Sequence, residues 1–244
     1  MRRRFFVDEV RKGHAQIQGD DARHLTRVLR VEVGQRYEIS DNRNIYLAEI
    51  VTARKDHVVF RTIEKLVAPA ETVRVTLCLA LIKFDRFEWI VEKATELGVS
   101  EILPMKTMRV EHGLDRAAVK RVERWRRIAL EASQQARRAH LPEIREPVTL
   151  AAALTVAADY RYVLDENHGG PSLNAALPGN RSNRDAVAIL VGPEGGWTVE
   201  ERAGFAGAGW TPVSMGPLIL RAETAAEAAL AVVANAWLPD RLKS

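Results

Sequence analysis

The chain has 244 residues, of which 47% are hydrophobic and 28% are charged, as in a globular protein with a substantial core. Its apolar runs stay well below the ~20 residues that span a bilayer, and its start, MRRRFFVDEV, has no apolar signal core, so we expect a cytoplasmic protein that has no membrane partner. The single cysteine, Cys78, excludes an internal disulfide, and the six scattered histidines lack the spacing of zinc ligands, so no metal is expected.

The positive charge is concentrated at the N-terminal end. Residues 1–68 hold 14 Lys and Arg against 10 Asp and Glu, which accounts for the whole net charge of +4. This asymmetry favours a polyanionic partner for the first quarter of the chain.

Short alternating segments at residues 14–19, 36–40, 45–51 and 57–63 predict a small antiparallel barrel. Between them, DDARHLTRVLR at 20–30 predicts a short helix with Leu25, Val28 and Leu29 on its apolar face. Proline and small residues at 67–72 predict a linker. We therefore expect two domains, residues 1–70 and 71–244.

The second segment alternates between strands and helices. Apolar runs at 73–82, 102–105, 160–165, 186–191 and 211–215 predict strands. Helices are expected at 84–99, with Asp85 as N-cap and Gly98 as C-cap, at 115–138 and at 224–237, and alanine-rich 151–158 is a further candidate. This order predicts an α/β domain with a largely parallel sheet.

The stretch AILVGPEGGWTVEE at 188–201 joins a buried strand to a helix. Thr198 and Glu201 have the spacing of a capping box, so the helix is expected to begin there. The glycines fall as G-x-x-G-G with no following lysine, which excludes both the dinucleotide fingerprint and the P-loop. Taken alone, the loop fits a tight turn as well as a ligand site at the carboxyl end of a strand.

A second stretch, SMGPLILRAETAAE at 214–227, repeats this arrangement. A strand leads into Gly216-Pro217, and Thr224 and Glu227 again have the spacing of a capping pair. The apolar run LILR inside this loop is costly unless something apolar covers it. If the two strands are neighbours, both loops line one crevice.

These residues resemble a known family, the bacterial ribosomal RNA small subunit methyltransferase E proteins, which are uracil-N3 methyltransferases of the SPOUT superfamily. The resemblance rests on KFDRFEWIVEKATELGV, VGPEGGWTVEE and MGPLILRAETAAEAAL, in this order and spacing. It extends to HLTRVLR and LEASQQARRAHLPEI, so it covers nearly the whole chain.

The resemblance implies an α/β fold with an N-terminal PUA-like β-barrel and a C-terminal SPOUT domain that ends in a deep trefoil knot, a rare exception to the rule against threaded loops. It implies S-adenosyl-L-methionine as the cofactor, bound in a bent shape, and N3 of a uridine in 16S rRNA of the small ribosomal subunit as the target. It also implies a homodimer.

Carried over position by position, the family pattern places the cofactor on two loops and a third wall. Leu218 and Leu220 would enclose the adenine. The full set of expected cofactor-binding residues is Leu164, Glu166, Leu190, Val191, Gly192, Pro193, Glu194, Gly195, Gly196, Met215, Gly216, Leu218, Ile219, Leu220 and Thr224.

Methylation at N3 requires removal of a proton and stabilisation of the uracil anion that develops. Arg221 is the expected cation, and Glu194 or Glu223 the expected base, although a carboxylate near a helix N-terminus is also favoured by the helix dipole. Leu218 stands where the family frequently has arginine, so Arg221 becomes the preferred candidate for the catalytic cation. Phe84, Gln134 and Ala136 also depart from the family pattern.

Basic residues are the expected RNA contacts, because phosphate contacts dominate affinity for nucleic acids. The candidates are Arg2, Arg3, Arg4, Arg23, His24, Arg27, Arg30, Lys83, Arg86, Arg109, Arg137 and Arg138. Two alternatives to uracil-N3 methylation remain at this point: another SPOUT activity such as ribose 2′-O-methylation of rRNA or tRNA, and a non-catalytic RNA-binding protein.

Overall fold

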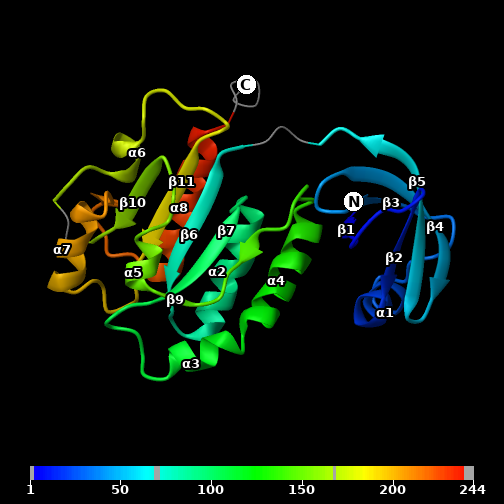
Figure 1. Ribbon diagram of the computed structural model, residues 1–244, viewed down its shortest axis with the longest axis horizontal. Helices are drawn as coiled ribbons and strands as arrows, with labels where there is room; N and C mark the ends of the chain where they lie inside the picture. The colour runs from blue at the N-terminus through cyan, green and yellow to red at the C-terminus, as the bar shows by residue number, and fades with distance from the viewer. Residues whose placement is uncertain (1–2, 69–71, 167–168, 239–244) are drawn as a thin grey trace. The chain divides into compact units, whose positions relative to one another are not determined.

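The computed structural model describes residues 3–68, 72–166 and 169–238 of the chain. The chain forms two compact units, one of Met1–Ala70 with Ser133–Leu141 and the other of Glu71–Ala132 with Pro142–Ser244 (Figure 1). The segment Ser133–Leu141 belongs to the first unit through contacts that no local pattern reveals. For example, the Ser40 hydroxyl donates to the carbonyl of Ala139 at 2.8 Å.

The first unit is a five-stranded sheet with one helix. The sheet order is β1-β3-β4-β5-β2, antiparallel except for the parallel pair β1 and β3. The four segments expected as strands form β2 to β5, and β1 is an addition. The elements are β1 (Arg4–Phe6), β2 (His14–Gln18), α1 (Gly19–Arg27), β3 (Arg36–Ser40), β4 (Ile45–Arg54) and β5 (His57–Leu66).

The core of this unit comes from alternate strand residues and one face of α1. Phe5, Ile39 and Phe60 are fully buried, and Leu25 of α1 packs against them. Val28 was expected on the same face but is 64% exposed, although its backbone is still helical and its amide donates to the carbonyl of His24. The apolar face of α1 is therefore narrower than the sequence pattern predicts.

The second unit is an α/β domain in which all strand pairs are parallel. The seven-stranded sheet has the order β12-β10-β11-β6-β7-β8, with β9 paired to β7. Its strands are β6 (Arg74–Ala80), β7 (Glu101–Lys106), β8 (Glu143–Ile144), β9 (Val148–Thr149), β10 (Tyr160–Leu164), β11 (Ala186–Val191) and β12 (Thr211–Val213). Its helices are α2 (Phe84–Glu96), α3 (Leu114–Val119), α4 (Val122–Gln135), α5 (Leu150–Ala153), α6 (Leu173–Ala176), α7 (Val199–Gly207) and α8 (Ala222–Ala236).

Helices cover both faces of this sheet, as the continuous apolar character of its central strands requires. In β11, Val187, Ile189 and Val191 pack into one hydrophobic cluster with α2, α4 and α8. The alternate residues Ala188 and Leu190 pack into a second cluster with α5 and α7. The expectation that β11 is buried on both faces is confirmed.

The helix expected at 115–138 is in fact two helices. Lys120 and Arg121 donate to the carbonyls of Ala117 and Ala118, three residues back, and these tight turns separate α3 from α4. The helical spacing of buried residues continues across the break, since Ala118 and Val122 are both in the core. Periodicity alone therefore could not reveal the break between α3 and α4. The helix candidate at 151–158 is likewise shorter, because α5 ends at Ala153.

Two helix caps also differ from expectation. α2 begins after Lys83, so Asp85 lies in its first turn and is not its N-cap. α8 begins after Arg221, with no side-chain cap, so Thr224 does not cap it. The Glu227 carboxylate, expected to complete that cap, instead accepts a hydrogen bond from the indole of Trp89 on α2.

Candidate functional site

A cavity of about 350 Å³ lies at the carboxyl ends of β10, β11 and β12. Because these strands are neighbours in the order β12-β10-β11, the segments that follow them meet at one edge of the sheet. The lining comes from these three segments, the start of α8 and one side chain of α2: Arg86, Leu164, Asp165, Glu166, Val191, Gly192, Pro193, Glu194, Gly196, Trp197, Ser214, Met215, Gly216, Leu218, Ile219, Leu220, Arg221, Ala222 and Ala225.

The glycines of the loop after β11 are required by close packing. A Cβ at Gly192 would lie 2.9 Å from the Trp197 ring, and one at Gly195 would lie 3.3 Å from Arg109 side-chain atoms. Gly196 has a positive φ of 69°, and its Cβ would lie 2.5 Å from a carboxylate oxygen of Glu166. Small residues at these positions let the backbone approach the neighbouring wall of the cavity.

Trp197 anchors this loop against the sheet. Its buried indole donates to the carbonyl of Leu164 at the end of β10, at 2.8 Å, and its ring packs edge-on against Phe205 of α7. The position follows directly after GPEGG in the sequence, but nothing in the local pattern indicated that it links two strands.

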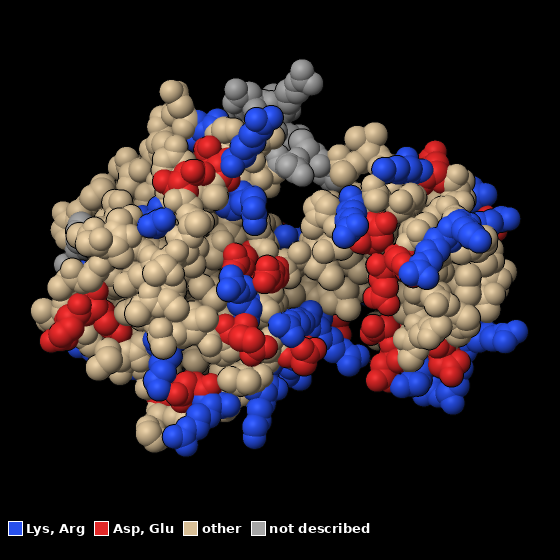
Figure 2. All heavy atoms as spheres, in the orientation of Figure 1, with Lys and Arg blue, Asp and Glu red and all other residues tan. Residues whose placement is uncertain are grey.

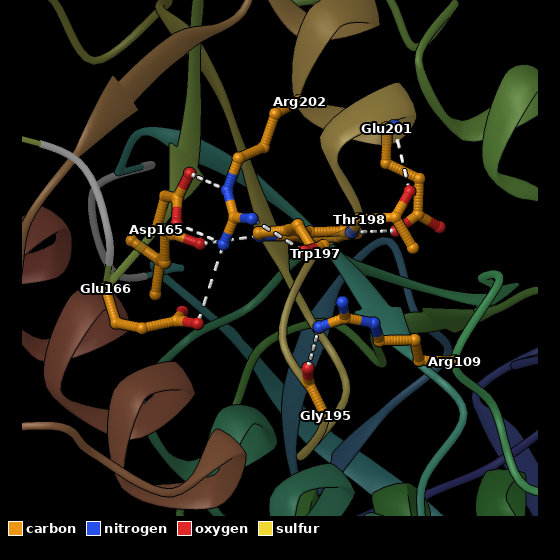
Figure 3. Close-up of polar contacts among 9 residues, drawn as sticks. Arg109, Asp165, Glu166, Gly195, Trp197, Thr198, Glu201 and Arg202 are labelled. Carbon is orange, nitrogen blue, oxygen red and sulfur yellow. Dashed lines mark hydrogen bonds and ion pairs between the residues drawn. The ribbon is translucent and has the colours of Figure 1, made fainter.

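Asp165 and Arg202 form a two-pronged ion pair beside the cavity (Figure 3). The Asp165 carboxylate is 3% exposed and accepts from Arg202 Nε at 2.7 Å and from Nη2 at 3.0 Å. Arg202 also donates to the Trp197 carbonyl at 2.7 Å and lies 3.6 Å from Glu166. Its hydrogen bonds to Asp165 raise the pKa of the Arg202 guanidinium. This one side chain therefore links the end of β10 to the loop after β11.

The helix that follows begins with the expected capping box. The Thr198 hydroxyl accepts from the amide of Glu201 at 3.2 Å, and the Glu201 carboxylate accepts from the amide of Thr198 at 2.9 Å. Glu201 also accepts from the amide of Met108 at 2.8 Å. Arg109, which follows Met108 in the chain, donates to the carbonyl of Gly195, as Figure 3 shows.

The loop after β12 carries the apolar run noted in the sequence. The Ser214 hydroxyl accepts from the amide of Gly216 and donates to its carbonyl, both at 3.0 Å, which closes the turn. Leu218 is 75% exposed and Ile219 is 84% exposed, although both line the cavity. Nothing within the described chain covers this apolar surface, so it is available to a ligand or a partner.

Arg86 of α2 lies between the two candidate bases. Its guanidinium is 3.3 Å from a carboxylate oxygen of Glu194 and 3.9 Å from one of Glu223. The second oxygen of Glu223 is buried and has no hydrogen-bond partner among the described residues. Arg86 was expected to contact RNA. Its contacts with both carboxylates instead place a second cation, besides Arg221, at this site.

Most residues expected to bind the cofactor line this cavity. Leu190, Gly195 and Thr224 do not, since Leu190 is fully buried in the sheet, Gly195 packs against Arg109, and Thr224 lies on the first turn of α8. Of the three residues expected to be catalytic, Glu194 and Arg221 line the cavity, and Glu223 reaches it through Arg86. The lining residues that were not expected from the sequence are Trp197, Ser214, Ala222 and Ala225, and Asp165 lies between the expected Leu164 and Glu166.

The expected RNA contacts differ in exposure. Arg3, Arg27, Arg30, Lys83, Arg109 and Arg137 are exposed, and Arg23, His24, Arg86 and Arg138 are partly buried. Arg4 is buried, donates to Glu38 and to the carbonyl of Arg137, and so belongs to the interior of the first unit. Arg137 also pairs with Glu38, and burial lowers the pKa of Arg138 to about 10. Arg2 lies outside the described residues.

On the face shown in Figure 2, basic and acidic side chains are mixed over both units. In residues 3–68, 72–166 and 169–238, no cluster of His, Cys, Asp and Glu is arranged to hold a metal ion. No helix in the same ranges is both long and apolar enough to cross a bilayer.

Two family models match the chain. An RNA methyltransferase domain covers residues 69–234, and an RNA methyltransferase PUA domain covers residues 17–63. The first model therefore spans the second unit and the cavity, and the second spans most of the first unit.

Relatives and solved structures agree with these models. The chain is 34% identical over 223 residues to a ribosomal RNA small subunit methyltransferase E from Synechocystis, covering 88% of this chain and 70% of the relative. It is 30% identical to the Bacillus subtilis protein of the same name, with 89% and 88% covered. Structures from Neisseria gonorrhoeae (TM-score 0.86, 27% identity) and Legionella pneumophila (TM-score 0.87, 28% identity) each cover 97% of this chain, which covers 98% of theirs. The chain thus belongs to the ribosomal RNA small subunit methyltransferase E family.

Proposed function

We propose that this protein uses S-adenosyl-L-methionine to methylate N3 of a specific uridine in 16S rRNA, giving 3-methyluridine. The observation that carries the proposal is the cavity formed by the two Gly-Pro loops and the end of β10. The Neisseria structure is described as a ribosomal RNA small subunit methyltransferase E bound to S-adenosyl methionine, and the Legionella structure as a methyltransferase in complex with the same cofactor.

The residues around the cavity fit this cofactor. Cβ atoms at Gly192 and Gly196 would collide with Trp197 and Glu166, so the loop backbone itself forms the cavity wall. The exposed Leu218 and Ile219 offer apolar surface for an adenine ring. Glu166 and Glu194 suit a cation better than a phosphate, and a sulfonium is a cation.

When bound, the cofactor supplies a methyl group on a positively charged sulfur, which makes that methyl electrophilic. The chain holds the uracil in line with it, because methyl transfer depends on the alignment of the reacting atoms. Arg86, on α2, stabilises negative charge on the uracil as the N3 proton leaves, and Arg221, just before α8, adds positive charge to the same cavity. Glu194 or Glu223 accepts that proton.

The finer features of the fold are part of the same proposal. We propose a closed PUA-like barrel for domain 1–70, which binds RNA, and a SPOUT domain with a trefoil knot for 71–244, which carries catalysis. We further propose a homodimer, supported by the exposed apolar Leu218, Ile219 and Trp89. The protein would act in the cytoplasm on the small ribosomal subunit, with no metal and no membrane partner.

Mass spectrometry of rRNA nucleosides from a strain that lacks the gene tests the reaction. We expect 3-methyluridine to disappear from 16S rRNA and to return when the gene is restored. Persistence of 3-methyluridine together with loss of a 2′-O-methylated nucleoside would instead identify a ribose methyltransferase.

Calorimetry with S-adenosylmethionine tests the cofactor separately. Failure of the purified protein to bind it would contradict every methyltransferase assignment and leave RNA binding alone. Sedimentation analysis checks the dimer.

A further inference from the structure

A second cavity of about 280 Å³ lies beside the first, where β6 ends and α2 begins. It is lined by Leu81, Ile82, Lys83, Arg86, Glu111, Leu114 and Glu194. β6 and β11 are neighbours in the sheet. After β6 the chain continues to β7 on one side of this pair, and after β11 it continues to β12 on the other side. The second cavity therefore lies at the point where the strand order reverses, where α/β sheets bind ligands.

Arg86 and Glu194 line both cavities. Their side chains are paired at 3.3 Å, so this ion pair forms part of the wall between the two spaces. Glu194 is 39% exposed and Arg86 is 32% exposed, so a group in the second cavity can contact side chains that also line the proposed cofactor cavity.

The chemistry of the lining matches one edge of uracil. That edge presents the O4 acceptor, the N3–H donor and the O2 acceptor, in this order. A complementary site needs hydrogen-bond donors on both sides of an acceptor. Lys83 and Arg86 supply donors, and the Glu194 carboxylate supplies the acceptor. Leu114 is partly exposed and supplies apolar surface for a face of the ring, whereas Leu81 and Ile82 are buried in the core.

We propose that the second cavity holds the target uracil, with Lys83 and Arg86 on its two carbonyl oxygens and Glu194 on N3. The proposal rests on the proposed function and names the base-recognition residues of that site. The uridine enters after it has left the RNA stack, as enzymes that act on bases require.

The assigned residues account for each atom in the transfer. The N3–H bond breaks, and its proton passes to the Glu194 carboxylate. The electron pair left on N3 forms the new bond to the methyl carbon, and the pair of the broken C–S bond stays on sulfur as a neutral thioether. Lys83 and Arg86 stabilise the charge that develops on the two carbonyl oxygens.

The same pattern excludes cytosine. At the corresponding edge cytosine presents an amino donor, an N3 acceptor and the O2 acceptor. Its amino group would face a cationic donor, and its unprotonated N3 would face the Glu194 carboxylate. Unpaired or repulsive polar contacts of this kind are the usual source of discrimination between such similar ligands.

Methyl NMR of the full chain, saturated with S-adenosylhomocysteine, tests the pocket directly. We expect uridine 5′-monophosphate to shift the methyl signals of Leu114, whose partly exposed side chain lines the cavity. Cytidine 5′-monophosphate, which has the same ribose and phosphate, should bind about tenfold more weakly, equivalent to about 1.4 kcal/mol. Equal binding of the two nucleotides, or shifts confined to other methyl groups, would overturn the assignment.

Two variants test the same residues in turnover on small ribosomal subunits that lack 3-methyluridine. Lys83→Ala and Glu194→Gln should each lower kcat about 100-fold, while the calorimetric affinity of Lys83→Ala for S-adenosylmethionine stays within about twofold of wild type. Lys120→Ala and Glu200→Gln, which remove like charges from exposed positions of the same unit, serve as matched controls and should keep the wild-type kcat.

The outcomes separate this inference from the function on which it rests. A wild-type protein that methylates N3, combined with normal kcat in Lys83→Ala and Glu194→Gln, would contradict the base pocket and leave the function intact. A wild-type protein that binds no S-adenosylmethionine would contradict the function itself.

Discussion

At the scale of single residues, the site depends on backbone that comes closer to its neighbours than a side chain would allow. Gly192 lies against Trp197, and Gly196 lies against Glu166 in a left-handed conformation. A larger residue at either position would push the loop into the cavity or displace the opposite wall. The glycines of GPEGG are therefore explained by packing between two strand ends.

Gly196→Ala should destabilise the protein by about 2 kcal/mol, because it places a Cβ in a left-handed backbone and against Glu166. It should also weaken S-adenosylmethionine binding at least about tenfold. Urea denaturation and calorimetry measure the two effects. Gly204→Ala is the control, since Gly204 lies within α7 with nothing near its Cβ position, and alanine there should raise stability by about 0.5 kcal/mol. Equal behaviour of the two variants would contradict the packing explanation.

At the scale of elements, α7 is attached to the site at its N-terminal end. Its capping box closes the first turn, and Arg202 reaches from the same turn to Asp165 at the end of β10. The second expected cap, at Thr224, is absent, so the two similar sequence patterns do different things.

Replacing Thr198 and Thr224 in turn distinguishes the sequence pattern that caps its helix from the one that does not. Thr198→Ala should cost about 1 kcal/mol of unfolding free energy, because it leaves the amide of Glu201 in the first turn without its side-chain acceptor. Thr224→Ala should change stability by less than about 0.5 kcal/mol, since its hydroxyl caps nothing. Chemical denaturation measures both, and a loss at Thr224 as large as that at Thr198 would show that α8 is capped in solution.

Arg202→Met should cost about 3 kcal/mol, because the Asp165 carboxylate is 3% exposed and would lose its two-pronged ion pair with Arg202. The double variant Arg202→Met with Asp165→Asn should recover part of this loss, since the buried charge is then gone. Urea denaturation of the four proteins in this cycle gives the coupling energy. Additive losses would mean that the pair contributes nothing beyond its separate side chains.

At the scale of the whole molecule, charge is distributed unevenly along the sequence, but basic and acidic side chains are mixed on the face shown in Figure 2. The net charge of +4 comes from the first 68 residues, yet Arg4 is buried there and Arg23 is paired with Asp20. The exposed Arg27 and Arg30 at the end of α1 are the stronger candidates for phosphate contacts.

Arg27→Ala and Arg30→Ala should each reduce the slope of log K against log salt for 16S rRNA by about one, because each removes one phosphate contact. Binding measured from low to moderate salt gives these slopes. Arg127→Ala is the control, since Arg127 pairs with Glu131 on α4 and is not among the expected contacts. Slopes unchanged in both the Arg27→Ala and the Arg30→Ala variant would place the RNA surface elsewhere.

The sequence by itself determined the alternation of the main strands and helices in the second unit, the two-sided burial of β11 and the capping box of α7, because these depend on periodicity and spacing within one element. It did not predict the short elements β8, β9 and α6 or the break between α3 and α4. The family resemblance predicted the set of cofactor-binding residues, and most of these residues line one cavity. Only the tertiary structure brought Arg86 between Glu194 and Glu223, paired Glu227 with Trp89 and buried Arg4. These pairings join different elements, so they depend on which strands are neighbours and on how the helices pack over them. No local pattern carries that information.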